Sequence, residues 1–152
     1  MVSEISIFEL GENIANQRAL YKLLLRLDEF YIPRISSQID LKEYSMKLLK
    51  SARVFCAITN KKKYAGLLAI YVNDKVNCKA FISTIGVFPV YNGLGVSKAL
   101  MLKAFEIAAD SGMSVVLLEV NINNQRAVSF YKKLGFEEKN KDGNKIVMVK
   151  EI

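Results

Sequence analysis

Histidine is absent from this chain of 152 residues, and so is tryptophan. Without histidine the chain has no Ser-His-Asp or Cys-His catalysis, and most zinc chemistry is excluded as well. Proton transfer must therefore use Glu, Asp, Tyr, Lys, Cys or water. The two cysteines, Cys56 and Cys78, are too few for a zinc site, so we expect no metal. Both fall in strand-like segments, where reduced core or surface residues are expected.

Long apolar runs and N-terminal targeting signals are also lacking. No run approaches the roughly 18 residues that a membrane helix needs. The first residues, from Met1 to Ile5, contain neither a basic region nor an apolar signal core. We therefore expect a cytoplasmic protein with no membrane partner. With 51% hydrophobic and 24% charged residues, the composition is typical of one folded domain spanning residues 1–152.

The formal net charge is +7, which suits an anionic ligand such as a phosphorylated cofactor. The lysines are scattered, apart from Lys61-Lys62-Lys63 between two strand-like segments. That triplet is most simply an exposed hairpin turn. No basic stripe alternates with aromatic residues, so nucleic acid is not an expected partner.

Apolar periodicity and turn signals predict the order strand, helix, helix, three strands, helix, strand, helix, two strands. The predicted segments are residues 3–10, 13–31, a helix capped by Asp40, 54–59, 64–72, 79–88, 94–109, 115–120, 124–134, and two strands within 136–152. In the first helix the predicted apolar face consists of Ile14, Leu20, Leu23, Leu24, Leu27 and Tyr31. Turns are predicted at Asn73-Asp74 and Asp142-Gly143. The order indicates an α/β (α+β) domain with a mixed sheet.

A glycine-rich segment, Val87-Phe88-Pro89-Val90-Tyr91-Asn92-Gly93-Leu94-Gly95, lies between a predicted strand and a predicted helix. Glycines let the backbone approach a ligand closely, and a helix N-terminus offers unpaired N–H groups and a partial positive charge. The segment therefore suits a phosphate site over residues 92–98. Taken alone, it is equally consistent with a plain turn between a strand and a helix.

A second segment, residues 118–136, favours the phosphate site, because the two segments together resemble the GCN5-related N-acetyltransferase (GNAT) family. The matching residues are Val87, Pro89, Tyr91, Gly93 and Gly95 in the first segment, and Asn124, Ala127, Tyr131, Leu134, Gly135 and Phe136 in the second. Two positions depart from the family pattern. Asn92 replaces the usual Arg or Gln, and Ser97 replaces the last Gly or Ala.

The resemblance implies a GNAT-like mixed central sheet of six to seven strands with about four helices, whose two central parallel strands splay apart. It also implies acetyl-CoA as co-substrate. The residues that would bind it are Ile85, Gly86, Val87, Asn92, Gly93, Leu94, Gly95, Val96, Ser97, Lys98, Asn124 and Tyr131. Backbone groups of residues 85–87 would pair with the pantetheine arm, and one N–H would polarise the thioester carbonyl. From the residues alone, Gly86 in an apolar strand indicates a bulge or a close backbone approach.

Two side chains are candidates for catalysis. Tyr131 matches a family phenol that protonates the departing thiolate, although its helical spacing also fits a core tyrosine. Glu119 interrupts an apolar strand, and a carboxylate in a partly apolar cleft suits proton abstraction. Its surroundings look like those of bacterial ribosomal-protein N-terminal acetyltransferases, in which the matching Glu is the base. Alternatively, Glu119 binds substrate or pairs with a lysine. Asn124, which the resemblance assigns to the pantetheine arm, also suits a helix N-cap, and the two roles are compatible.

The expected function is direct transfer of an acetyl group from acetyl-CoA to a primary amine. The acceptor could be a protein N-terminus or a small amine such as an amino sugar, a polyamine or an antibiotic. Residues 11–50 match no family pattern, and Tyr31, Arg34, Ser36 and Ser37 could line the acceptor site or form a plain surface connection. The rival hypotheses are a non-catalytic acyl-CoA-binding or sensing module and a nucleotide-binding regulator. Strands in the C-terminal tail leave a homodimer open.

Overall fold

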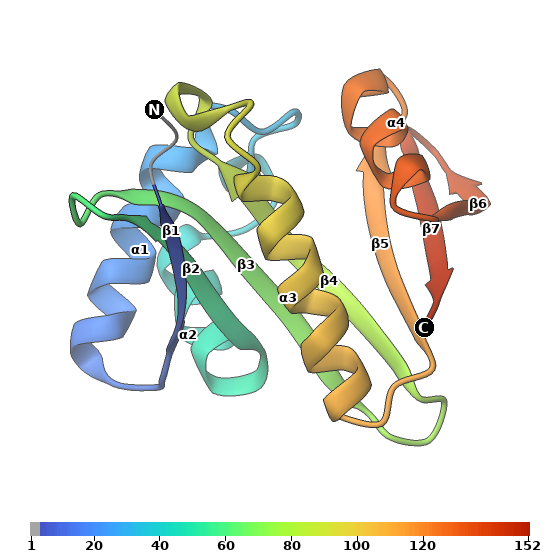
Figure 1. The fold of residues 1–152 in the computed structure, drawn as a ribbon, viewed down its shortest axis with the longest axis horizontal. Coiled ribbons are helices and arrows are strands. Elements are labelled where there is room, and N and C mark those ends of the chain that lie inside the picture. Colours follow the sequence, from blue (N-terminus) through green and yellow to red (C-terminus); the bar gives the residue numbers. More distant parts are fainter. Residues whose placement is uncertain (1–3) are drawn as a thin grey trace.

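A seven-stranded mixed sheet with helices on both faces forms the computed structural model, which describes residues 4–152 (Figure 1). The strands are β1 (Ile5–Leu10), β2 (Arg53–Thr59), β3 (Tyr64–Asp74), β4 (Lys79–Val87), β5 (Val115–Asn121), β6 (Glu137–Asp142) and β7 (Lys145–Glu151). The helices are α1 (Ile14–Asp28), α2 (Leu41–Ser51), α3 (Val96–Asp110) and α4 (Gln125–Lys133), with short 3-10 turns η1 (Ile35–Ser37) and η2 (Pro89–Tyr91). The predicted element order and the mixed sheet are confirmed.

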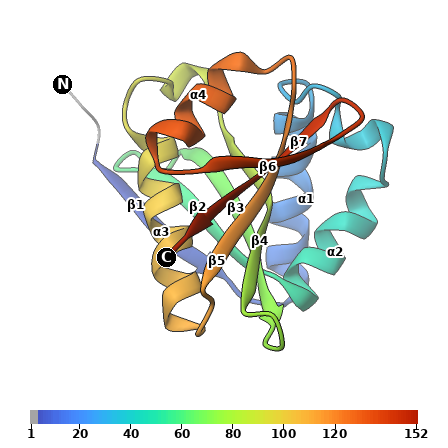
Figure 2. The ribbon, with the colours of Figure 1, turned by 90° about the vertical axis from the view of Figure 1, so that its right-hand side faces the viewer.

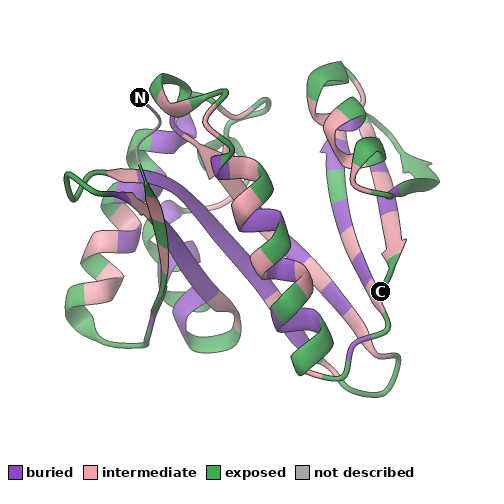
Figure 3. Cartoon of the chain, viewed as in Figure 1, coloured by how far each residue is buried: buried purple, intermediate pink, exposed green. Residues whose placement is uncertain are grey.

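The sheet separates two apolar cores. Helices α3 and α4 cover one face and α1 and α2 cover the other (Figure 2). Along β3, Leu68 and Ile70 face the α3 side, whereas Leu67 and Ala69 face the α1–α2 side. The middle of β3 is therefore buried on both faces, and Figure 3 shows it as a continuous purple (buried) stretch of ribbon. This explains why its sequence is an apolar run without alternation.

The two parallel strands in the middle of the sheet, β4 and β5, splay apart. The strand order is β1-β2-β3-β4-β5-β7-β6, and β4 pairs with β5 only from Lys79 opposite Val115 to Ile82 opposite Leu118. Beyond that point each strand stays paired with its other neighbour, β4 with β3 and β5 with β7. The expected splaying is confirmed, and it leaves one edge of β4 open over its last residues.

Short polar side chains start three of the four helices. The Oδ1 atoms of Asn13, Asp40 and Asn124 accept hydrogen bonds from backbone N–H groups three residues on, at 2.8, 2.9 and 3.2 Å. The caps predicted at Asp40 and Asn124 are therefore present. Helix α3 differs, because Gly95 occupies its N-cap position and supplies no side-chain bond.

The first helix is shorter than predicted and its apolar face is narrower. Helix α1 ends at Asp28, so Tyr31 lies in the connection to η1, and Ile14 is 70% exposed. Beyond Asp28 the chain continues in short turns, in which the N–H groups of Phe30 and Tyr31 donate to the carbonyls of Leu27 and Asp28. The strand predicted from Ser3 begins at Ile5, and Ser3 lies outside the described residues.

The turn predicted at Asn73-Asp74 lies further along the chain. Both residues belong to β3, and residues 75–78 make the turn. Its geometry comes from the Asp74 carboxylate, which accepts a hydrogen bond from the backbone N–H of Asn77 at 3.0 Å. Cys78 therefore lies in this turn, with a φ of 52°, and not in a strand.

Candidate active site

A cleft of about 630 Å³ opens where β4 and β5 part. It is bordered by these two strands, by the connection between α1 and α2, and by α4. The residues of the sequence-based site that line it are Ile85, Gly86, Val87, Glu119, Asn124 and Tyr131. The fold thus brings together residues from three elements, β4, β5 and α4, that lie far apart in the sequence.

A row of free backbone donors lies beyond the end of β4. Within residues 4–152, no N–H group of residues 93–98 has an intramolecular backbone partner. Gly93 and Gly95 have φ values of +81° and +80°, which turn the chain into α3, and no heavy atom beyond the adjacent residues lies within 4 Å of where either Cβ would be. The last three donors belong to the first turn of α3, where helix geometry leaves them unpaired. We call residues 93–98 the N–H cradle, and its chemistry suits a phosphate or diphosphate.

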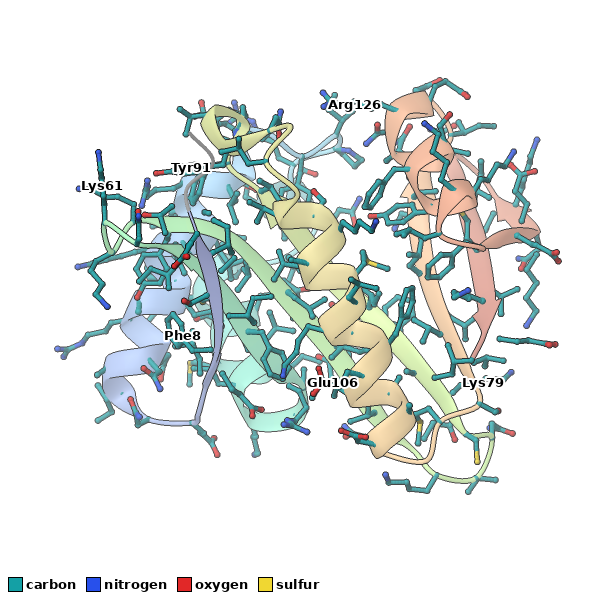
Figure 4. All side chains as sticks on the ribbon, in the orientation of Figure 1. Phe8, Lys61, Lys79, Tyr91, Glu106 and Arg126 are labelled. Atoms are coloured by element: carbon teal, nitrogen blue, oxygen red, sulfur yellow. The ribbon has the colours of Figure 1, made fainter. Side chains whose placement is uncertain are left out.

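Side chains from two elements extend at the same end of the molecule as the cradle. Figure 4 marks them with Tyr91 on η2 and Arg126 in the first turn of α4. Arg126 and Lys98 are exposed cations.

In the part of the chain from Glu4 onward, no group of three His, Cys, Asp or Glu residues could hold a metal ion. None of its helices is long and apolar enough to cross a membrane.

Strand β4 carries a bulge at Ser83, which lies opposite no residue of β3. A bulge can place two successive side chains on one face. The hydroxyls of Ser83 and Thr84 both form hydrogen bonds with the Tyr44 hydroxyl of α2. The sequence analysis missed this cluster because 39 residues separate Tyr44 from Ser83. The bulge is not at Gly86, where the observed feature is the alternative one, a close approach by Tyr31.

Tyr131 extends from α4 into the cleft. Its ring contacts Phe130 and Phe136 in edge-on arrangements, with centroid separations of 5.4 and 5.7 Å. Burial raises the pKa of Tyr131 to about 12. The phenol therefore stays protonated at neutral pH, as a proton donor must.

Glu119 lies on β5 with its carboxylate toward solvent and the cleft. The side chain is 41% exposed, and its Oε2 atom lies 3.5 Å from Nζ of Lys145 on β7. The lysine partner that was one alternative for Glu119 is thus present. Lys145 pairs in register opposite Asn121, which explains its proximity, but no pattern in the sequence indicated it.

The four loop residues considered for the acceptor side divide into two pairs. Tyr31 and Arg34 line the cleft, whereas Ser36 and Ser37 do not. Ser36 donates its N–H at 2.9 Å and its hydroxyl to the Asp28 carboxylate, and the Ser37 hydroxyl donates to the Arg34 carbonyl at 2.6 Å.

The contacts of Asp28 hold this loop in shape. Burial raises the pKa of Asp28, but the Ser36 hydrogen bonds and the nearby Arg34 lower it more, so the net shift is downward. The carboxylate therefore remains charged and keeps its hydrogen bonds to Ser36. In this way the two serines shape the connection that carries Tyr31 and Arg34.

An open strand edge leading to an N–H cradle defines a site for an extended ligand with a phosphorylated end. A family model described as "Acetyltransferase (GNAT) family" matches residues 18–136. The chain belongs to this family.

Relatives agree with this assignment, and a solved structure shares the fold. The chain is 33% identical over 142 residues to an uncharacterized N-acetyltransferase of Methanocaldococcus jannaschii, covering 83% of this chain and 63% of the relative. It is 26% identical over 117 residues to N-alpha-acetyltransferase MAK3 of Arabidopsis thaliana, covering 71% and 62%. The chain thus spans about six tenths of the length of both relatives. The fold is shared with PaiA N-acetyltransferase from Thermoplasma acidophilum in complex with coenzyme A, with a TM-score of 0.76, 20% identity, and 98% and 99% of the two chains covered.

Proposed function

We propose that this protein transfers an acetyl group from acetyl-CoA to a primary amine by direct attack within a ternary complex. The observation that carries the proposal is the open edge of β4, which runs from the cleft to the N–H cradle. An extended pantetheine arm can pair with a free strand edge, while the diphosphate of the same molecule accepts hydrogen bonds from the cradle. Family membership and the coenzyme A complex of a protein with the same fold support acetyl-CoA as the donor.

The direction of the backbone groups in β4 supports this pairing. Ile85 accepts a hydrogen bond through its carbonyl from Tyr31, on the side away from β3. Backbone groups alternate sides along an antiparallel strand, so those of Val87 point the same way as those of Ile85. Val87 therefore offers its N–H and carbonyl groups to the donor, and Ile85 offers its N–H group, since the Ile85 carbonyl is bonded to Tyr31. One of these N–H groups would stabilise negative charge on the thioester oxygen.

In the proposed reaction, Glu119, directly or through a water molecule, removes a proton from the acceptor ammonium. The amine nitrogen then forms a bond to the thioester carbon, and the carbon–sulfur bond breaks. Tyr131 gives its proton to the departing thiolate, and solvent restores that proton. Asn124 would contact the pantetheine arm with its side-chain NH₂, because its Oδ1 is already bonded to the N–H of Ala127.

Replacement of Tyr131 by phenylalanine tests the acid. We expect Tyr131→Phe to lower kcat by about 100-fold, since general acid–base groups typically contribute that much or more, with little change in the affinity for CoA. The measurement is thiol release with a panel of amines, together with CoA binding by calorimetry. Tyr21→Phe is the matched control, because Tyr21 lies on α1 and does not line the cleft. An unchanged kcat in Tyr131→Phe would remove Tyr131 as the acid.

Replacement of Glu119 by glutamine tests the base. The expected result is a lower kcat and loss of the acidic limb of the pH–rate profile, because the carboxylate that accepts the proton is gone. Lys145→Gln separates this role from the ion pair, since it breaks the same contact but keeps the carboxylate. A pH–rate profile of Glu119→Gln that matches the wild type would assign the base to water or to another group.

The acceptor panel should include short peptides with free N-termini, amino sugars and polyamines. The name of the Arabidopsis relative, N-alpha-acetyltransferase, favours the peptides, and so does the Glu119–Tyr131 pair. The loop side of the cleft is exposed and lined mostly by apolar residues, with Arg34 and Gln38 as polar ones, and it is also compatible with small amines. Binding of acetyl-CoA without thiol release for any amine would instead indicate a non-catalytic acyl-CoA-binding module. Preference for ATP over CoA would indicate a nucleotide-binding regulator.

A further inference from the structure

One phenol reaches the open edge of β4 from the connection after α1, 54 residues earlier in the chain. The Tyr31 hydroxyl donates to the Ile85 carbonyl at 2.8 Å. Tyr31 is held there by the connection after α1, where its N–H donates to the Asp28 carbonyl at 3.2 Å and the Asp28 carboxylate binds Ser36. The loop and the strand edge are therefore joined at the middle of the cleft.

Glycine at position 86 makes this contact possible. A Cβ atom there would lie 2.3 Å from the Tyr31 hydroxyl oxygen and 3.1 Å from its Cζ atom. Any other residue would push the phenol away from the strand. The pair of Gly86 and Tyr31 thus fixes the position of one hydroxyl group with little freedom.

Tyr31 lines the same cleft as Tyr131. Burial, followed by the neighbouring phenols of Tyr131 and Tyr44, raises the pKa of Tyr31. Tyr31 is therefore a neutral hydrogen-bonding group and is unsuited to act as a base. A hydroxyl has one proton and two lone pairs, and its proton is committed to Ile85. Its lone pairs remain available as acceptors in the cleft.

We propose that Tyr31 is a positioning residue that holds the acceptor amine against the open edge of β4, because its hydroxyl oxygen accepts a hydrogen bond from one N–H group of the amine. The Ile85 carbonyl fixes the phenol, and the phenol fixes the nitrogen beside the place of the thioester. The proton that the ammonium loses goes to the base. The proton that is hydrogen-bonded to Tyr31 stays on the nitrogen. The inference rests on the proposed function and adds the element that orients the acceptor, whatever the remainder of that molecule is.

Tyr31→Phe removes the hydroxyl and keeps the ring. We expect the KM for the amine to rise roughly tenfold, as for the loss of one buried hydrogen bond, and kcat to fall. The KM for acetyl-CoA and the shape of the pH–rate profile should stay unchanged. Tyr71→Phe is the control, because Tyr71 is a phenol of the neighbouring strand that does not line the cleft. An unchanged KM for the amine in a folded Tyr31→Phe protein would overturn the assignment.

Gly86→Ala displaces the same hydroxyl without altering Tyr31, and it provides a second test if Tyr31→Phe fails to fold. It should raise the KM for the amine in the wild type and have much less effect in the Tyr31→Phe background, where the oxygen that the new methyl meets is gone. Additive effects of the two changes would contradict the proposal. Wild-type protein that turns over no amine would overturn the proposed function itself. Normal turnover with an insensitive Tyr31 would overturn only the positioning role.

Discussion

At the scale of single residues, the environment decides the chemistry of each titratable group. Tyr131 and Glu119 both line the cleft, yet Tyr131 is enclosed by aromatic rings while Glu119 is solvated and paired with Lys145. An enclosed phenol remains protonated and can give its proton to a thiolate. A carboxylate that is open to the cleft can accept a proton from a bound ammonium group. The two side chains thus suit opposite roles.

Cys56 supplies a residue-scale prediction about stability and pH. It is fully buried, and burial raises its pKa from 9.0 to about 12. Between these pH values the unfolded chain has lost the thiol proton and the folded chain has kept it. The contribution of Cys56 to the free energy of unfolding is therefore fully present below about pH 9. As the pH rises from 9 towards 12, that free energy falls by at most about 1.4 kcal/mol per pH unit.

Denaturant unfolding at pH 8 and pH 10 measures this loss. From pH 8 to pH 10, the free energy of unfolding should fall less in Cys56→Ala than in the wild type. Cys78→Ser should keep the wild-type fall, because Cys78 lies in the exposed turn after β3 and not in a core. Equal falls in Cys56→Ala and the wild type would show that the Cys56 thiol does not couple folding to pH.

At the scale of elements, the start of α3 is distinctive because the other three helices are capped by side chains and this one is not. A capping side chain would occupy one of the backbone donors. With Gly95 in that position, the N–H groups of the first turn remain free for an anion. The missing cap therefore fits a binding role better than a purely structural one.

Gly95→Ala tests this role, with Gly112→Ala as its matched control. The two glycines lie at opposite ends of α3, have φ values of +80° and +78°, and have no heavy atom beyond the adjacent residues within 4 Å of the place that a Cβ would take. Each change should lower the free energy of unfolding by about 1 kcal/mol, because alanine is strained at positive φ. Only Gly95→Ala should also weaken acetyl-CoA binding several-fold in calorimetry. Equal weakening in both variants would mean that the loss follows stability and not the cradle.

At the scale of the whole molecule, the sheet is two halves joined by a short parallel segment. Strands β1 to β4 carry α1, α2 and α3, and β5 to β7 carry α4. The two halves share only four residue pairs between β4 and β5, and the cleft fills the remaining space between these strands. A donor molecule paired with the edge of β4 would contact both halves. At the outer edge, every residue of β6 is exposed and most are charged, which disfavours strand pairing between copies there.

The sequence by itself determined the element order, the caps at Asp40 and Asn124, and the glycine turn into α3. These features depend on neighbours within a few residues, such as the Asp40 carboxylate and the N–H of Glu43. The two motifs carried the family resemblance, and the resemblance added the splayed strands. The roles of Glu119, Asn124 and Tyr131 remain predictions, although the fold places all three at one cleft.

Only the tertiary structure decided what surrounds the strand edge. Tyr31 meets Ile85 across 54 residues, and Tyr44 meets Thr84 across 40. Which side chain reaches a given carbonyl depends on where α1 ends, on the loop held by Asp28, and on the space that Gly86 leaves open. Apolar periodicity does not predict such contacts, because it indicates which face of an element is buried and not which residue covers that face. The motifs for the acetyl donor are therefore local and can be recognised in the sequence. The acceptor side of the cleft depends on contacts that form only when the chain folds.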